Sequence, residues 1–154
     1  MVNHYFLDTS ALAKRYIPEI GTPWINRITA PAENNILLLC QLAWVELQSA
    51  ISRRQRENTL TPEQSQILSI NFQTHWNTDY HIITVDQTLL NLASALIKKH
   101  PLRAYDSVQL ASALIIQPSL PNPATNPFTF VSADDRLLTI AQLEGLTTFN
   151  PNRA

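Results

Sequence analysis

The segment Tyr5-Phe6-Leu7-Asp8-Thr9-Ser10 joins an apolar run of strand length to a polar helix start, with a carboxylate at the junction. Val131-Ser132-Ala133-Asp134-Asp135-Arg136 has the same arrangement far along the chain. Between these segments, strand-like and helix-like runs alternate, which favours a mostly parallel sheet covered on both faces. The carboxyl ends of parallel strands share one edge of the sheet, so we expect Asp8 and Asp134 to lie near each other.

The hydrophobic pattern predicts an α/β fold with a central, mostly parallel sheet of four to five strands and helices on both faces. A single domain over residues 1–154 fits the length, and the 45% of apolar residues is typical of a folded protein. The proline-rich residues 117–127 predict an extended surface loop. Strands are expected at residues 2–7, 36–40, 81–85, 128–132 and 147–149. Helices are expected at 10–17 and 22–29, after the strand 36–40 as far as about residue 56, from 61 to about 77, and at 87–99, 105–117 and 135–143.

Composition excludes several classes of protein. The single cysteine, Cys40, rules out an internal disulfide framework and multi-cysteine zinc sites. The two glycines, Gly21 and Gly145, provide neither a phosphate-binding loop nor a dinucleotide fingerprint, and no G-x-S-x-G segment is present. No apolar run approaches the ~20 residues of a membrane helix, and the N-terminus lacks a secretory pattern. We therefore expect a soluble, cytoplasmic protein without a membrane partner.

Four carboxylates remain as candidates for chemistry: Asp8, Glu46, Asp106 and Asp134. Acids gathered at one sheet edge would repel one another unless a divalent cation neutralised them, and oxygen ligands suit Mg²⁺ or Mn²⁺. The four histidines (His4, His75, His81 and His100) show no paired helical spacing, so we expect them to be surface or packing residues.

Each acid also has a purely structural explanation. Asp8, Asp86 and Asp134 can cap helices, and Asp106 can be a first-turn acid that the helix dipole favours. Asp135 competes with Asp134 for the same role. Glu46 lies on an apolar helix stripe where an unpaired charge is costly, so it either lines a metal pocket or pairs with a cation such as Arg53.

Four stretches together resemble the motifs of PIN domains, most closely those of VapC-like toxins of type II toxin–antitoxin pairs. They are Leu7-Asp8-Thr9-Ser10-Ala11-Leu12, Glu46 in its helix, Leu102-Arg103-Ala104-Tyr105-Asp106-Ser107-Val108-Gln109-Leu110-Ala111 and Val131-Ser132-Ala133-Asp134-Asp135-Arg136-Leu137-Leu138. The resemblance covers essentially the whole chain. It implies a PIN fold, a homodimer and a VapB-type antitoxin as partner.

The resemblance also implies a metal-dependent endoribonuclease in which metal-activated water hydrolyses RNA phosphodiester bonds. Asp8, Glu46, Asp106 and Asp134 would form the acidic quartet, and Asp8 and Asp106 would hold the Mg²⁺ or Mn²⁺ most directly. Thr9 and Ser10 match the small hydroxyl residues that order the pocket. The products would carry a 5′-phosphate and a 3′-hydroxyl. The alternative is a catalytically silent PIN-like module that only binds RNA or protein.

RNA needs positive charge at the rim of an acidic pocket, because the formal net charge of −1 gives no long-range attraction. Candidate phosphate contacts are Lys14, Arg15, Arg53, Arg54, Arg56 and Arg103. The structural alternative for the cluster Arg53–Arg56 is to complement a helix C-terminus in solvent. The tryptophans (Trp24, Trp44 and Trp76) are expected in the core or at a dimer surface.

Overall fold

The computed structural model describes residues 1–154 and contains one five-stranded sheet in the order β3-β2-β1-β4-β5, with every pair of neighbouring strands parallel. This confirms the predicted fold class. The strands are β1 (His4–Leu7), β2 (Ile36–Cys40), β3 (Tyr80–Ile83), β4 (Phe128–Val131) and β5 (Thr148–Phe149). The strand order reverses between β1 and β4, since chain order runs outward from β1 to one edge and from β4 to the other.

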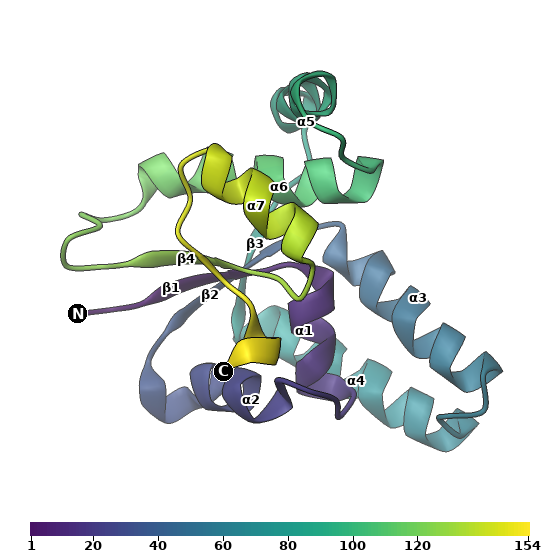
Figure 1. Ribbon diagram of the computed structural model, residues 1–154. Coiled ribbons are helices and arrows are strands. Elements are labelled where there is room, and N and C mark those ends of the chain that lie inside the picture. The colour runs from purple at the N-terminus through teal and green to yellow at the C-terminus, as the bar shows by residue number, and fades with distance from the viewer.

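Seven helices cover the two faces of the sheet (Figure 1). Helices α5, α6 and α7 lie on one side, and α1, α2, α3 and α4 lie on the other. The bounds are α1 (Thr9–Tyr16), α2 (Thr22–Thr29), α3 (Ala43–Arg56), α4 (Pro62–Thr78), α5 (Gln87–Lys99), α6 (Ala104–Ile116) and α7 (Asp135–Leu143).

Successive strand residues point to opposite faces, so β1 and β4 contribute to two separate cores. Phe6 and Phe130 stack with ring centroids 5.4 Å apart in the core beneath α5, α6 and α7. Leu7 and Val131 enter the core on the side of α1 and α3. Cys40 is a buried free thiol at the end of β2. Both sheet faces are therefore apolar, as a covered parallel sheet requires.

Local sequence signals explain where several helices begin. Thr61 forms a capping box with Gln64 at the start of α4, which has Pro62 in its first turn. Asp86 accepts a hydrogen bond from the Leu89 amide at the start of α5, as expected for a cap. Three short 3-10 turns, at Pro31–Glu33, Gln117–Ser119 and Pro151–Arg153, were not predicted.

Aromatic side chains tie the outer helices to the sheet. Trp24 of α2 stacks on Phe149 of β5 at 4.3 Å. Trp76 packs edge-on against Trp44 where α3 meets α4, and Trp44 keeps 41% of its surface exposed. No helix combines the length and the apolar character that crossing a bilayer would require.

Candidate functional site

The predicted acids lie at the carboxyl edge of the sheet, where the strand order reverses. Asp8 directly follows β1, and Ser132 and Asp134 follow the neighbouring strand β4. Open parallel sheets form a crevice at such a reversal, because the connections from the two strands leave toward opposite faces. Glu46 reaches this place from the first turn of α3, and Asp106 reaches it from the first turn of α6.

One cavity of about 680 Å³ is lined by all four predicted acids. Its walls come from α1, α3, α6 and the segment that joins β4 to α7. The structure thus brings together residues that are up to 126 positions apart in the chain. Its remaining lining residues are Thr9, Ser10, Ala13, Lys14, Ile17, Glu19, Leu42, Val45, Ser49, Ala50, Arg53, Arg54, Arg103, Tyr105, Gln109 and Ala133.

Asp8 both caps α1 and lines the cavity, so its role as a helix cap does not exclude a role in the pocket. Its Oδ1 accepts hydrogen bonds from the Ala11 amide at 2.9 Å and from Ser10 Oγ at 2.7 Å. Its Oδ2 accepts a hydrogen bond from Ser132 Oγ at 2.6 Å. The carboxylate is thereby held at the base of the pocket, with only 5% of the residue exposed.

Burial raises the pKa of Asp8 to about 6, because an ion in the interior loses its hydration. Hydrogen bonds from Ser132, Ser10 and Ala11 oppose this rise, and the charge of Asp106 adds to it. The carboxylate therefore lies in a setting that disfavours its charge, which a nearby cation would relieve.

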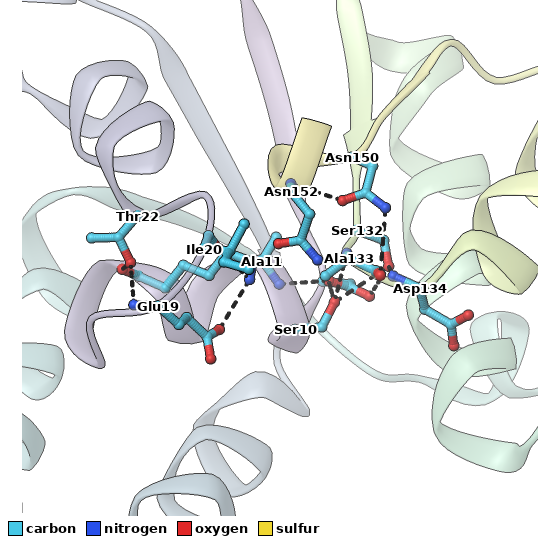
Figure 2. Close-up of polar contacts among 12 residues, drawn as sticks. Ser10, Ala11, Glu19, Ile20, Thr22, Ser132, Ala133, Asp134, Asn150 and Asn152 are labelled. Atoms are coloured by element: carbon cyan, nitrogen blue, oxygen red, sulfur yellow. Dashed lines mark hydrogen bonds and ion pairs between the residues drawn. The ribbon is translucent and has the colours of Figure 1, made fainter. Parts of the chain in front are cut away.

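A network of hydroxyl groups links the ends of β1 and β4 (Figure 2). Ser10 Oγ accepts a hydrogen bond from the Ala133 amide at 2.9 Å, and Ser132 Oγ accepts one from the Asp134 amide at 3.0 Å. Ser10, for which the family resemblance implies a role in ordering the pocket, thus bonds to both Asp8 and Ala133. Ser132 was not predicted to have a role, although it is fully buried and donates to Asp8. A serine that interrupts an apolar strand end was the available signal.

Glu46 makes no ion pair, so the predicted alternative of a cationic partner such as Arg53 is wrong. Its carboxylate accepts a hydrogen bond from the Gln109 amide, with Nε2 3.3 Å from Oε1. Burial raises the pKa of Glu46, and the charge of Asp106 adds to this effect, whereas Thr9 and Gln109 oppose it.

Asp106 is the acid whose charge couples to the other three. It raises the pKa of both Asp8 and Glu46. Its own pKa is raised by burial first and by the charge of Asp134 second, while Arg103 lowers it. Mutual repulsion of this kind indicates that the acids share one electrostatic environment.

The structure separates Asp134 from its neighbour Asp135. Asp134 caps α7 by accepting a hydrogen bond from the Arg136 amide at 2.9 Å, and it also lines the cavity. Asp135 is not a lining residue of that cavity. It pairs instead with Arg153 and accepts a hydrogen bond from Asn150 at 2.9 Å; these hydrogen bonds lower the pKa of Asp135 to about 2.

The predicted basic residues divide into two groups. Lys14, Arg53, Arg54 and Arg103 line the acidic cavity, whereas Arg15 and Arg56 do not. Arg15 lies elsewhere, with its guanidinium bound to Asp79 at 2.8 Å and to the Tyr80 hydroxyl at 2.7 Å.

Two of the lining cations share one acidic partner, so the three groups together keep one positive charge. Glu19 contacts both Lys14 and Arg54 at 3.1 Å (Figure 2 shows Glu19 on the far side of Ala11 from Asp134). Arg53 and Arg103 make no ion pair within the chain.

A second hollow of about 450 Å³ adjoins the first and shares Arg103, Asp106 and Asp134 with it. Arg136 lines this second hollow and likewise has no ion pair. Its other lining residues are Ile97, His100, Pro101, Leu102, Leu137 and Ile140. Asp106 and Asp134 therefore line both hollows together with Arg103, whereas Asp8 and Glu46 line only the first.

The donor chemistry of the cavity fits a hard divalent cation, since carboxylates line the cavity and no histidine or cysteine does. No three His, Cys, Asp or Glu side chains gather closely enough to hold one ion together. Proteins usually hold Mg²⁺ through one or two carboxylates, while water and substrate oxygens complete its shell.

No family model matches the chain, and no curated protein matches its sequence. Solved structures do match nearly its full length. FitAcB from Neisseria gonorrhoeae has 17% identity and a TM-score of 0.66, and covers 96% of this chain and 97% of that chain. VapBC2 from Rickettsia felis, bound to a DNA fragment from their promoter, has 16% identity and a TM-score of 0.65, and covers 96% and 98%.

The chain has a PIN fold. A third structure, PAE2754 from Pyrobaculum aerophilum, has 17% identity and a TM-score of 0.54, with 99% of this chain and 93% of that chain covered. Identities this low establish the architecture alone. The chemistry of this PIN-fold protein must be argued from its own side chains.

Proposed function

We propose that this protein is a metal-dependent endoribonuclease of the VapC kind, which hydrolyses RNA phosphodiester bonds with activated water. The observation that carries the proposal is the convergence of Asp8, Glu46, Asp106 and Asp134 on one cavity at the strand-order reversal. The PIN fold, shared with FitAcB and VapBC2, supports it.

In this proposal Asp8 and Asp106 hold Mg²⁺ or Mn²⁺, and Glu46 and Asp134 complete the negative charge of the pocket. The cation, when bound, supplies the positive charge that activates water and offsets the charge developing on the phosphoryl oxygens. Ser10 and Ser132 hold Asp8 in place through short hydrogen bonds. Arg53 and Arg103, which lack ion pairs, are positioned to contact RNA phosphates.

We also propose that the protein binds a VapB-type antitoxin and that it forms a homodimer. The antitoxin rests on the fold shared with VapBC2, and the homodimer rests on the family resemblance in the motifs. The partly exposed Trp44 and the exposed Val45 on α3 are candidate contacts for either assembly.

Cleavage of single-stranded RNA by the purified protein tests the proposal. We expect cleavage with Mg²⁺ or Mn²⁺, none in excess chelator, and a loss of at least about a hundredfold in Asp8→Asn. Asp86→Asn is the matched control, because Asp86 caps α5 as Asp8 caps α1 but lies outside both hollows.

The chemistry of the product ends decides the mechanism. Attack by water leaves a 5′-phosphate and a 3′-hydroxyl, whereas attack by the neighbouring 2′-oxygen leaves a cyclic phosphate. Cyclic ends, or undiminished turnover in chelator, would contradict the proposal. RNA binding without any cleavage would favour the alternative of a silent binding module.

A further inference from the structure

Gln109 is a buried polar residue that connects three of the elements forming the acidic cavity. It lies three positions after Asp106 in α6, so the two side chains share one face of the helix. Its Nε2 lies 3.1 Å from Thr9 Oγ1 in α1 and 3.3 Å from Glu46 Oε1 in α3. Only 2% of the residue is exposed.

The other end of this amide has no partner. Gln109 Oε1 is buried and accepts no hydrogen bond, one of three such side-chain atoms in the protein. Turning the amide over would not help, because its oxygen would then face the carboxylate of Glu46, which can only accept. The orphaned oxygen is thus a consequence of donating to Glu46, and it costs stability.

A neutral hydrogen-bond donor and a cationic one have different effects on the charge of the carboxylate that accepts from them. An arginine or lysine beside Glu46 would fix the carboxylate but would also cancel its charge. The amide of Gln109 fixes the carboxylate and leaves its negative charge for a cation in the pocket. Outer partners of this kind are a common means of orienting metal-site carboxylates.

We propose that Gln109 is a positioning residue, which holds the Glu46 carboxylate toward the acidic cavity by a hydrogen bond that preserves its charge. The proposal rests on the proposed nuclease function and adds the residue that orders one of its acids.

Replacing Gln109 with leucine tests this proposal, because it should lower metal affinity and turnover without lowering the stability of the fold. In Gln109→Leu the orphaned oxygen disappears, so we expect the urea midpoint of unfolding to stay unchanged or to rise. We expect affinity for Mn²⁺, measured by calorimetry without RNA, to fall about tenfold and kcat to fall by at least as much. The KM for RNA should change less than twofold, since only 2% of Gln109 is exposed.

Ser112→Ala is the matched control, because Ser112 is a fully buried polar residue of the same helix that does not line the cavity and whose hydroxyl donates to the Val108 carbonyl of α6 at 2.8 Å. This variant should keep the affinity for Mn²⁺ and kcat. Wild-type affinity and turnover in Gln109→Leu would overturn the proposal. Losses that only follow a lowered urea midpoint would also overturn it, since Gln109 would then serve packing alone.

A further readout separates this proposal from the nuclease function. The carboxyl carbon resonance of Glu46, compared at one pH between wild type and Gln109→Leu without metal, should shift in the variant. If the wild type neither binds Mn²⁺ nor cleaves RNA, the nuclease function fails, and this resonance still decides whether Gln109 holds Glu46. An unchanged resonance would overturn the positioning role.

Discussion

At the scale of single residues, Asp8 shows that one carboxylate can both cap a helix and line a pocket. Its two oxygens accept hydrogen bonds from three groups while the side chain lines the cavity. Its pKa of about 6 means that the folded, metal-free protein binds a proton at Asp8 more tightly than the unfolded chain does. The charged form is therefore a source of instability until a cation arrives.

The stability of the metal-free protein should therefore depend on pH. Because the pKa of Asp8 is raised on folding, its contribution to stability falls as pH rises from about 4 to about 6 and is then constant. The loss amounts to about 3 kcal/mol, as an order of magnitude. In chelator, Asp8→Asn should thus be more stable than wild type by up to this amount at pH 7.5 and hardly different at pH 4.

Urea unfolding of both proteins at the two pH values measures this difference. The asparagine amide can donate to Ser132 Oγ, so the substitution keeps the packing of the site. Added Mg²⁺ should raise the urea midpoint of wild type and leave that of Asp8→Asn in place. A stability difference that did not vary with pH would contradict the assigned environment of Asp8.

At the scale of elements, the start of α7 separates two adjacent acids. Asp134 and Asp135 differ by one position, which is about 100° around a helix, and this sends one side chain to the cavity and the other to Arg153. Asp134→Asn keeps a good helix cap while it removes the charge. We expect it to abolish RNA cleavage with little change in the thermal midpoint.

Asp135→Asn gives the opposite test at the same helix end. Its ion pair with Arg153 is exposed, and exposed pairs contribute little to stability. Cleavage should therefore stay within about twofold of wild type. Loss of cleavage in this variant, with activity retained in Asp134→Asn, would reverse the assignment of the fourth acid.

Much of the fold was predictable from local signals. The helices α2, α5 and α7 begin and end as predicted, since a first-turn proline or a capping aspartate marks their starts. Strand β3 was expected at residues 81–85 but spans Tyr80–Ile83. It pairs only with β2, so its bounds are set by that neighbour and not by its own sequence.

The site was only partly predictable, for a different reason. Acids at strand ends follow from local sequence, but the hydrogen bond from Gln109 to Thr9 and that from Ser132 to Asp8 join residues 100 and 124 positions apart. Such partners depend on how α6 packs and on which strands become neighbours. Likewise, the ion pair of Arg15 with Asp79, outside the cavity, depends on tertiary packing.

At the scale of the whole molecule, charge is distributed unevenly around the acidic cavity. Glu19 pairs with both Lys14 and Arg54, whereas Arg103, which lines both hollows, and Arg136, which lines the second, are unpaired. With a formal net charge of −1, RNA binding must depend on such unpaired cations. This distribution favours a path in which a bound RNA strand passes the acids and runs through both hollows.

Arg136→Gln tests this path in an Asp8→Asn background, which prevents cleavage. Fluorescence anisotropy with single-stranded RNA should show weaker binding, and the slope of log affinity against log salt should decrease by about 0.7, as expected for one lost phosphate contact. Arg56→Gln serves as the control, since Arg56 is exposed but lines neither hollow. Equal salt slopes in the two variants would exclude this path.

The reversal of strand order between β1 and β4 has a consequence for synthesis of the chain in the cell. A chain that has emerged from the ribosome only as far as Gln117 contains Asp8, Glu46 and Asp106, but β4 has not yet added Ser132 and Asp134 beside β1. A nuclease of the kind proposed here would thus stay incomplete until β4 has been made and has paired with β1. The order of the strands in the sheet therefore makes assembly of the proposed site depend on a late segment of the chain.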